Sequence, residues 1–204
     1  MNKIEYLPIF PTLIQVTKLD LNTDSIIEFC YEMKRQNKKG ISKTNVGGWQ
    51  SDNLINEVHS KEFSKLKTEI EAATNKYHSE INFKKKLKQE LSDIWANINQ
   101  KGNMNEVHTH PKSALSGTFY LTKGGAPILF QHPVTEMSQH YWEKYCVEIC
   151  NPVNSDAFLI EPDPNLLLIF PPWALHKVSV NTEDIDRISL SFNTVFYNKQ
   201  EGDK

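Results

Sequence analysis

The chain has 204 residues, of which 39% are hydrophobic and 24% are charged, and its formal net charge is −2. This length fits one domain with a sizeable core. The composition is that of a globular protein and shows no basic excess for nucleic acid. No stretch approaches the roughly 18 apolar residues of a membrane span, and the start MNKIEYLPIFPTLIQV lacks the pattern of a secretion signal. We therefore expect a cytoplasmic protein.

The first 90 residues predict one strand and two helices. Residues 7–16 mix Ile, Phe, Val and Pro, which is typical of an edge strand. A first helix is expected after Thr23 or Asp24, either of which could cap it. A second helix is expected after Ser60, where apolar residues recur at steps of three and four. These residues are Phe63, Leu66, Ile70, Ala73 and Tyr77.

Residues 38–52, between the two predicted helices, hold three glycines and many polar residues. This pattern predicts a loop, and a loop at this place could cover a site. The three cysteines are an odd number, and Cys146 and Cys150 have no second pair with which to complete a zinc site. We expect them to be free or buried thiols.

From Leu91 onward, short apolar segments alternate with Gly, Pro and Asn. Several short strands separated by turns favour an antiparallel sandwich or barrel with helices outside one sheet. The expected fold is therefore mainly β with flanking helices. Residues 1–204 should form a single domain in which residues 1–90 pack on a barrel core of residues 91–198.

Three histidines stand out as candidate metal ligands. Side chains two apart on a strand point the same way, so His108 and His110 should face one side together. His176 follows the segment LLLIFPPWAL, in which an apolar strand runs into a Pro-Pro turn. Three neutral imidazoles suit zinc, iron, nickel or copper. The alternative is that the His-x-His pair arises by chance and that the histidines satisfy core hydrogen bonds.

Arg187 is one of only two arginines among 23 basic residues. A guanidinium holds a carboxylate through two parallel hydrogen bonds, which an ammonium cannot do. Arg187 begins the segment RISLSFNTV, where it shares a polar strand face with Ser189 and Ser191. The other face holds Ile188, Leu190 and Phe192 and is expected to be buried in the core. On local sequence alone, a surface ion pair with Asp184 or Asp186 explains this arginine better. Together with the three histidines, however, Arg187 could anchor an acidic co-substrate beside a metal.

At this point the sequence resembles the iron(II)- and 2-oxoglutarate-dependent oxygenases of bacteria and their phages, relatives of the prolyl hydroxylases. The resemblance lies in WANINQKGNMNEVHTHPKSALSGTFYL, IFPPWALHKV and RISLSFN, and more weakly in the opening YLPIFPTLIQV. It implies a double-stranded β-helix, a jelly-roll barrel with one iron in its open mouth. It also implies 2-oxoglutarate and dioxygen as co-substrates, and the host cytoplasm as location if a phage encodes the protein.

Carried across by position, His108 and His176 match the first and the distal iron ligands of the family. Arg187 and Ser189 match the pair that holds the distal carboxylate of 2-oxoglutarate. The sequence departs from the family pattern at His110, which stands where the wider superfamily has a carboxylate ligand. Either it is a third neutral ligand, or it stands aside and water takes the position.

Further residues could reach the co-substrate or the substrate. By strand parity these are Tyr120, Ser116, Thr118, Asn97 and Asn99. Among the tryptophans, only Trp173 is placed near the site by sequence. His132 and His140 are weak candidates for contacts, and His59 and His78 are expected on the surface.

Two other functions fit parts of the sequence. A cupin-type three-histidine metalloenzyme would usually have a Glu shortly after the His-x-His pair, whereas residues 111–115 here are PKSAL. A non-catalytic jelly-roll binding protein would keep the fold without using Arg187 and His176. The substrate stays open between a peptidyl side chain, a small molecule and a modified base. The charge argues weakly against nucleic acid, and the sequence allows a homodimer.

Overall fold

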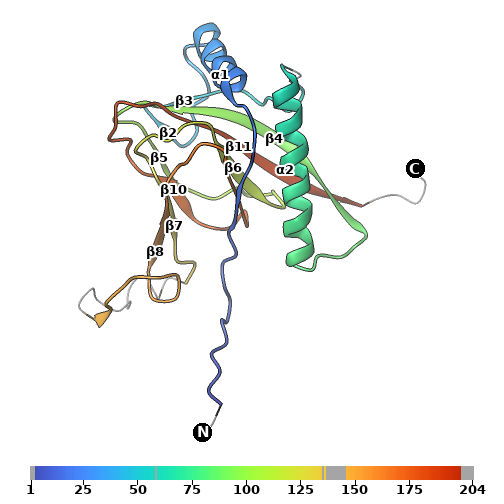
Figure 1. Cartoon of the computed structure of the whole chain (residues 1–204), viewed down its shortest axis with the longest axis vertical. Coiled ribbons are helices and arrows are strands. Elements are labelled where there is room, and N and C mark those ends of the chain that lie inside the picture. Colours follow the sequence, from blue (N-terminus) through green and yellow to red (C-terminus); the bar gives the residue numbers. More distant parts are fainter. Residues whose placement is uncertain (1–2, 58, 135, 137–145, 199–204) are drawn as a thin grey trace.

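The computed structural model describes residues 3–57, 59–134, 136 and 146–198, and it contains two antiparallel sheets (Figure 1). The six-stranded sheet has the order β1 (Gln15–Lys18), β9 (Leu166–Phe170), β6 (Ser116–Tyr120), β11 (Arg187–Asn198), β4 (Leu87–Asn99) and β3 (Trp49–Gln50). The five-stranded sheet has the order β2 (Asn45–Val46), β5 (Met104–His108), β10 (His176–Val178), β7 (Ile128–Gln131) and β8 (Ala157–Ile160). The predicted double-stranded β-helix with flanking helices is confirmed.

Both predicted helices are present: the second packs against β4 and β9 of the six-stranded sheet, and the first packs against the second (Figure 1). Helix α1 spans Asp24–Gln36, directly after Thr23, whose side chain makes no capping bond. Helix α2 spans Lys61–Glu80 and is capped by Ser60, whose hydroxyl accepts the backbone N–H of Phe63 at 3.1 Å. Such a cap satisfies a helical N–H that otherwise has no partner. The apolar face predicted for the second helix is buried on the sheet.

The two faces of the six-stranded sheet differ in polarity. On β11, Ile188, Leu190 and Phe192 are fully buried in the core shared with the helices. Strand residues alternate between faces, so Arg187, Ser189 and Ser191 point to the space between the sheets. Strand β4 behaves likewise, with Ile94, Ala96 and Ile98 in the helix-side core. The sheet thus turns a polar face inward, where a site can form.

Two expectations for the N-terminal part need correction. Strand β1 is an edge strand, but it covers only Gln15–Lys18 and not residues 7–16. Pro8 and Pro11 interrupt the earlier part, since proline cannot donate a ladder hydrogen bond. Residues 38–52 are not a simple loop, because they include β2 and β3, one in each sheet. No helix in the described ranges is long and apolar enough to cross a membrane.

Gly117 on β6 allows three strands of the large sheet to pack closely. A methyl group added there would lie 2.2 Å from the ring of Phe192 and 2.5 Å from the backbone oxygen of Leu168. We predict that Gly117→Ala lowers the free energy of unfolding by about 1–3 kcal/mol, because the core must shift to admit the methyl group. Urea denaturation of the metal-free protein measures this, and an unchanged midpoint would contradict the packing described.

Candidate active site

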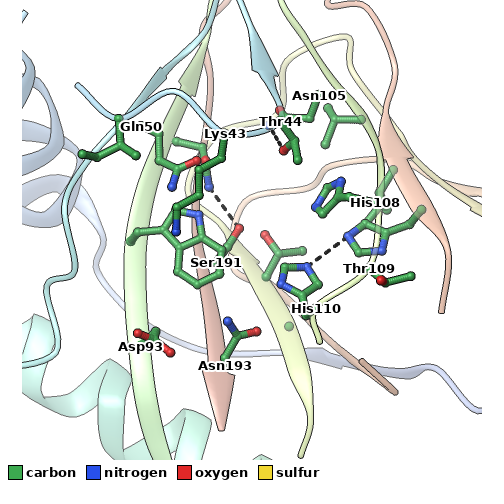
Figure 2. A pocket seen from close by; sticks show the side chains of 18 of the residues that line it. Lys43, Thr44, Gln50, Asp93, Asn105, His108, Thr109, His110, Ser191 and Asn193 are labelled. Atoms are coloured by element: carbon green, nitrogen blue, oxygen red, sulfur yellow. Dashed lines mark hydrogen bonds between the residues drawn. The ribbon is translucent and has the colours of Figure 1, made fainter. Parts of the chain in front are cut away.

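A cavity of about 550 Å³ lies between the two sheets (Figure 2). Its wall includes residues of β4, β6 and β11 from one sheet and of β5, β7 and β10 from the other. Residues from the 38–52 segment also line it, among them Lys43, Thr44 and Gln50. The segment predicted to cover a site therefore forms part of the cavity wall.

The three candidate histidines meet on this wall. His108 ends β5 and His176 begins β10, and the two are direct partners in the antiparallel pairing of these strands. The expectation that His110 shares the strand with His108 is wrong, since β5 ends at His108. His110 lies two residues further on, where its backbone N–H donates to the carbonyl of Pro172 at 2.9 Å. That bond holds the turn against the segment before His176.

Backbone carbonyls orient two of the imidazoles. Nδ1 of His108 lies 2.7 Å from the Glu106 carbonyl, and Nδ1 of His176 lies 2.8 Å from the Ala174 carbonyl. A carbonyl only accepts, so each Nδ1 carries the proton and each Nε2 keeps a free lone pair. Nε2 of His110 is 3.4 Å from Nε2 of His176. One ligand atom from each of the three side chains lies within 4.8 Å of the others.

The electrostatics keep these imidazoles neutral. Burial, reinforced by the neighbouring histidines and Lys43, lowers the pKa of His110 to about 3. Burial and the proximity of His108 lower the pKa of His176 to about 4. The pKa of His108 is lowered as well, again mainly by burial. At neutral pH all three therefore offer lone pairs, which is the form that binds a metal ion.

The group fits a metal held on one side. Two nitrogens bound at about 2.1 Å and at right angles would be about 3 Å apart, close to the separation of His110 and His176. Three ligands on one face leave other positions open for exogenous ligands, as in the facial arrangement of non-haem iron oxygenases. The fully protein-bound tetrahedral site of structural zinc would need a fourth ligand. No fourth His, Cys, Asp or Glu joins this group among the described residues.

Arg187 is a buried cation next to this space. Only 2% of its surface is exposed, its guanidinium lies 4.8 Å from the centre of the Tyr120 ring, and its Nη1 donates to Ser189 at 3.1 Å. It makes no ion pair with any described residue. Asp184 instead pairs with Lys101, and Asp186 accepts the Tyr31 hydroxyl. The surface ion pair considered from the sequence is therefore wrong.

Several polar atoms around Arg187 lack partners within the described part of the chain. They are Nε of Arg187, the Tyr120 hydroxyl, Oγ1 of Thr118 and Oδ1 of Asn99. Burial raises the pKa of Tyr120, so its hydroxyl keeps its proton and can donate. Buried polar atoms are normally hydrogen-bonded. Nε of Arg187 and the two hydroxyls can donate to an anionic ligand, whereas Oδ1 of Asn99 can only accept a hydrogen bond.

The remaining candidates are placed as follows. Asn97 lines the cavity and donates to Ser191 at 3.0 Å, while Asn99 is fully buried and donates to Asn105 at 3.0 Å. The Ser116 hydroxyl donates to Asn193 at 2.8 Å. Thus Asn97 can contact a ligand directly, whereas Asn99 is not part of the cavity wall and bonds to Asn105, which is.

Several aromatic and histidine side chains lie elsewhere. Trp173 is 53% exposed and does not line the cavity, so its placement near the site was wrong. His132 lies outside the cavity wall, and His59 stacks on Phe29. His78 is half-buried beside Phe83, not on the open surface. His140 lies outside the described residues.

Several residues that line the cavity were not singled out from the sequence, and three of them are Trp95, Lys43 and Asn105. The ring of Trp95 lies 6.0 Å from that of His110, Lys43 reaches the cavity from the 38–52 segment, and Asn105 lines it from β5. Trp95 could have been found, because it shares strand parity with Asn97 in the segment WANIN. The other two depend on how β2 and β5 pair, which the sequence alone does not show.

Residues 93–193 match the family described as "Putative 2OG-Fe(II) oxygenase". These residues contain all three histidines, Arg187 and Ser189. No curated protein matches the chain by sequence.

Three solved structures illustrate the similarity in fold. A viral collagen prolyl hydroxylase from Paramecium bursaria Chlorella virus-1 has a TM-score of 0.58 and 12% identity, over 89% of this chain and 94% of that one. A prolyl hydroxylase from Trichoplax adhaerens has a TM-score of 0.63 and 9% identity, over 89% and 83%. HygX from Streptomyces hygroscopicus, solved with nickel and 2-oxoglutarate, has a TM-score of 0.59 and 9% identity, over 90% and 83%. Through its residues 93–193, this chain belongs to the 2OG-Fe(II) oxygenase family, whose members are enzymes that use iron(II) and 2-oxoglutarate.

Proposed function

We propose that the protein hydroxylates its substrate with an iron(II) ion held by His108, His110 and His176. The observation that carries this assignment is the convergence of three neutral imidazoles, two of them oriented by backbone carbonyls. This choice makes His110 a ligand instead of leaving its position to water, because its Nε2 already lies beside that of His176. The resulting ligand set is entirely neutral.

Arg187 is proposed to bind the distal carboxylate of 2-oxoglutarate, with Ser189 and Tyr120 beside it. Ser189 is already bonded to Nη1, which fixes the plane of the guanidinium. Nε of Arg187 and the Tyr120 hydroxyl are then free to donate to the carboxylate. Arginine suits this task better than lysine because its planar fork matches the two carboxylate oxygens.

The overall reaction balances with one dioxygen per turnover. One oxygen atom enters a substrate C–H bond to give C–OH, and the other enters 2-oxoglutarate, which loses carbon dioxide and becomes succinate. The substrate and 2-oxoglutarate each give two electrons, which together reduce dioxygen fully. Iron, when bound, supplies the site at which dioxygen is activated. The chain's own residues hold the metal from one side, dock the co-substrate and limit access of water.

The whole chain is proposed to act as one catalytic domain, because β1, β2 and β3 of the N-terminal part complete the two sheets. Its partners would be 2-oxoglutarate and one substrate. The net charge of −2 supports a substrate other than nucleic acid. Two of the similar structures are prolyl hydroxylases, and a peptidyl or small-molecule substrate is consistent with the open cavity.

Metal binding can be tested without knowing the substrate. We predict that metal-free protein binds one cobalt(II) ion, seen by its visible absorption, and that His176→Ala raises the dissociation constant by roughly 100-fold or more. His132→Ala is the matched control, because His132 lies outside the cavity wall. Equal loss of affinity in both variants, or none in either, would contradict the ligand assignment.

Co-substrate binding has a separate test. Under anaerobic conditions, iron(II) and 2-oxoglutarate should give a weak visible charge-transfer band. Arg187→Lys should raise the 2-oxoglutarate concentration needed for half of this band by about tenfold to 100-fold, because one charge-assisted hydrogen bond is lost. Arg35→Lys is the control, since Arg35 pairs with Glu32 on the surface.

In the same experiment, pyruvate distinguishes an effect of Arg187→Lys on binding of the distal carboxylate from an effect on the metal site. It is a keto acid without the distal carboxylate, so its band should respond little to Arg187→Lys. If Arg187→Lys weakened the binding of pyruvate and of 2-oxoglutarate equally, Arg187 would be acting on the metal site or the fold, and the anchoring role would be wrong.

A further inference from the structure

One part of the cavity is used by neither the proposed metal site nor the 2-oxoglutarate anchor. Along β4 and β11 the inward residues form cross-strand pairs, with Asn99 opposite Arg187, Trp95 opposite Ser191 and Asp93 opposite Asn193. Asp93 therefore lies beyond Trp95 on the side away from Arg187, roughly 7 Å further along the strand. Figure 2 shows Asp93 and Asn193 together at one end of the cavity.

The Asp93 carboxylate is held in place by neutral donors. Asn53 donates to Oδ1 and Ser92 donates to Oδ2, each at 3.0 Å. Asn53 is itself fixed, because its side-chain oxygen accepts the backbone N–H groups of Ile94 and Ile55. The carboxylate is thus preorganised at the cavity wall before any ligand arrives.

No described lysine or arginine forms an ion pair with Asp93. Lys43 also lines the cavity, but Figure 2 shows it at a different part of the wall from Asp93. Three other carboxylates, those of Asp163, Glu32 and Asp184, do have basic partners. The charge of Asp93 is therefore available to a ligand in the cavity.

Trp95 provides the second half of a cation site. It is half-buried, lines the cavity and lies on the same face of β4 as Asp93, with its ring 6.0 Å from the ring of His110. An indole face attracts an ammonium or guanidinium group, most strongly where water is partly excluded. A carboxylate and an indole two residues apart on one strand face thus form a surface that favours a cation.

We propose that the substrate carries a cationic amine or guanidinium, which binds between Asp93 and Trp95 and directs a neighbouring carbon towards the metal. This inference rests on the proposed function, since it assumes that His110 marks the reacting centre. Asp93 and Trp95 are then specificity-determining residues. A neutral substrate of equal length would leave the carboxylate without a partner and bind more weakly.

The test uses the full chain with iron(II) and 2-oxoglutarate under anaerobic conditions, with binding read from changes in the charge-transfer band. The probes are L-lysine, cadaverine and an acetylated, amidated lysine peptide, which separate a free amino acid, a simple amine and a peptidyl side chain. The neutral control is acetylated, amidated norleucine, which has no ammonium group and whose side chain ends one atom before that of lysine; we call it the norleucine probe. We expect at least one cationic probe to perturb the band with a dissociation constant at least tenfold below that of the norleucine probe.

Asp93→Asn should remove this preference while leaving the band with 2-oxoglutarate intact, which shows that the variant is folded and loaded. Asp163→Asn, at the exposed ion pair with Lys18, should keep the preference. Three results would each overturn the proposal. The norleucine probe could bind as tightly as the cationic probes, Asp93→Asn could keep the preference, or no cationic probe could change a band that is otherwise normal. A missing band in the unmodified protein would instead contradict the proposed function, and the inference with it.

Discussion

The antiparallel pairing of β11 with β4 is the constraint on which the rest of the structure depends. It keeps one register from Arg187 opposite Asn99 to Asn193 opposite Asp93, shifts at a bulge between Asn193 and Thr194, and then continues to Asn198 opposite Leu87. Because a shift by one residue would turn every side chain to the other face, this register decides which residues meet the helices and which meet the cavity. The apolar set packs under α1 and α2, and the polar set becomes the inner wall.

Burial gives the site its chemical character. The same desolvation that lowers the pKa values of His110 and His176 leaves Arg187 as a charged group in a space that disfavours charge. A buried cation without a carboxylate is costly, and a dianionic co-substrate would relieve that cost. Neutral imidazoles and a buried cation are thus two consequences of one enclosed cavity. An anionic co-substrate that chelates a metal ion would suit both the neutral imidazoles and the buried Arg187.

Much of the architecture was predictable because local patterns were strong. The periodic apolar face of Phe63, Leu66 and Ile70 predicted α2, and the alternation in RISLSFN predicted which face of β11 would be buried. Arg187 stood out because arginine is rare in this chain. These signals depend on side-chain spacing within one element, which the sequence shows directly.

The positions of site residues that depend on pairing between distant strands were less predictable. The meeting of His108 with His176 is set by the register of β5 and β10, strands that are far apart in the sequence. His110 reaches the group through a turn bonded to Pro172, although parity along one strand had been expected to place it. Trp173 is close to His176 in sequence and yet points to solvent, whereas Trp95 lines the cavity. Proximity along the chain is a poor guide where a turn intervenes.

The most direct test of this account is a crystal structure of the protein grown without oxygen in the presence of iron(II) and 2-oxoglutarate. The account predicts iron bound to Nε2 of His108, His110 and His176, with the distal carboxylate of 2-oxoglutarate on Arg187. Iron bound by only two of these histidines with His110 turned away, or a carboxylate held elsewhere than at Arg187, would contradict it.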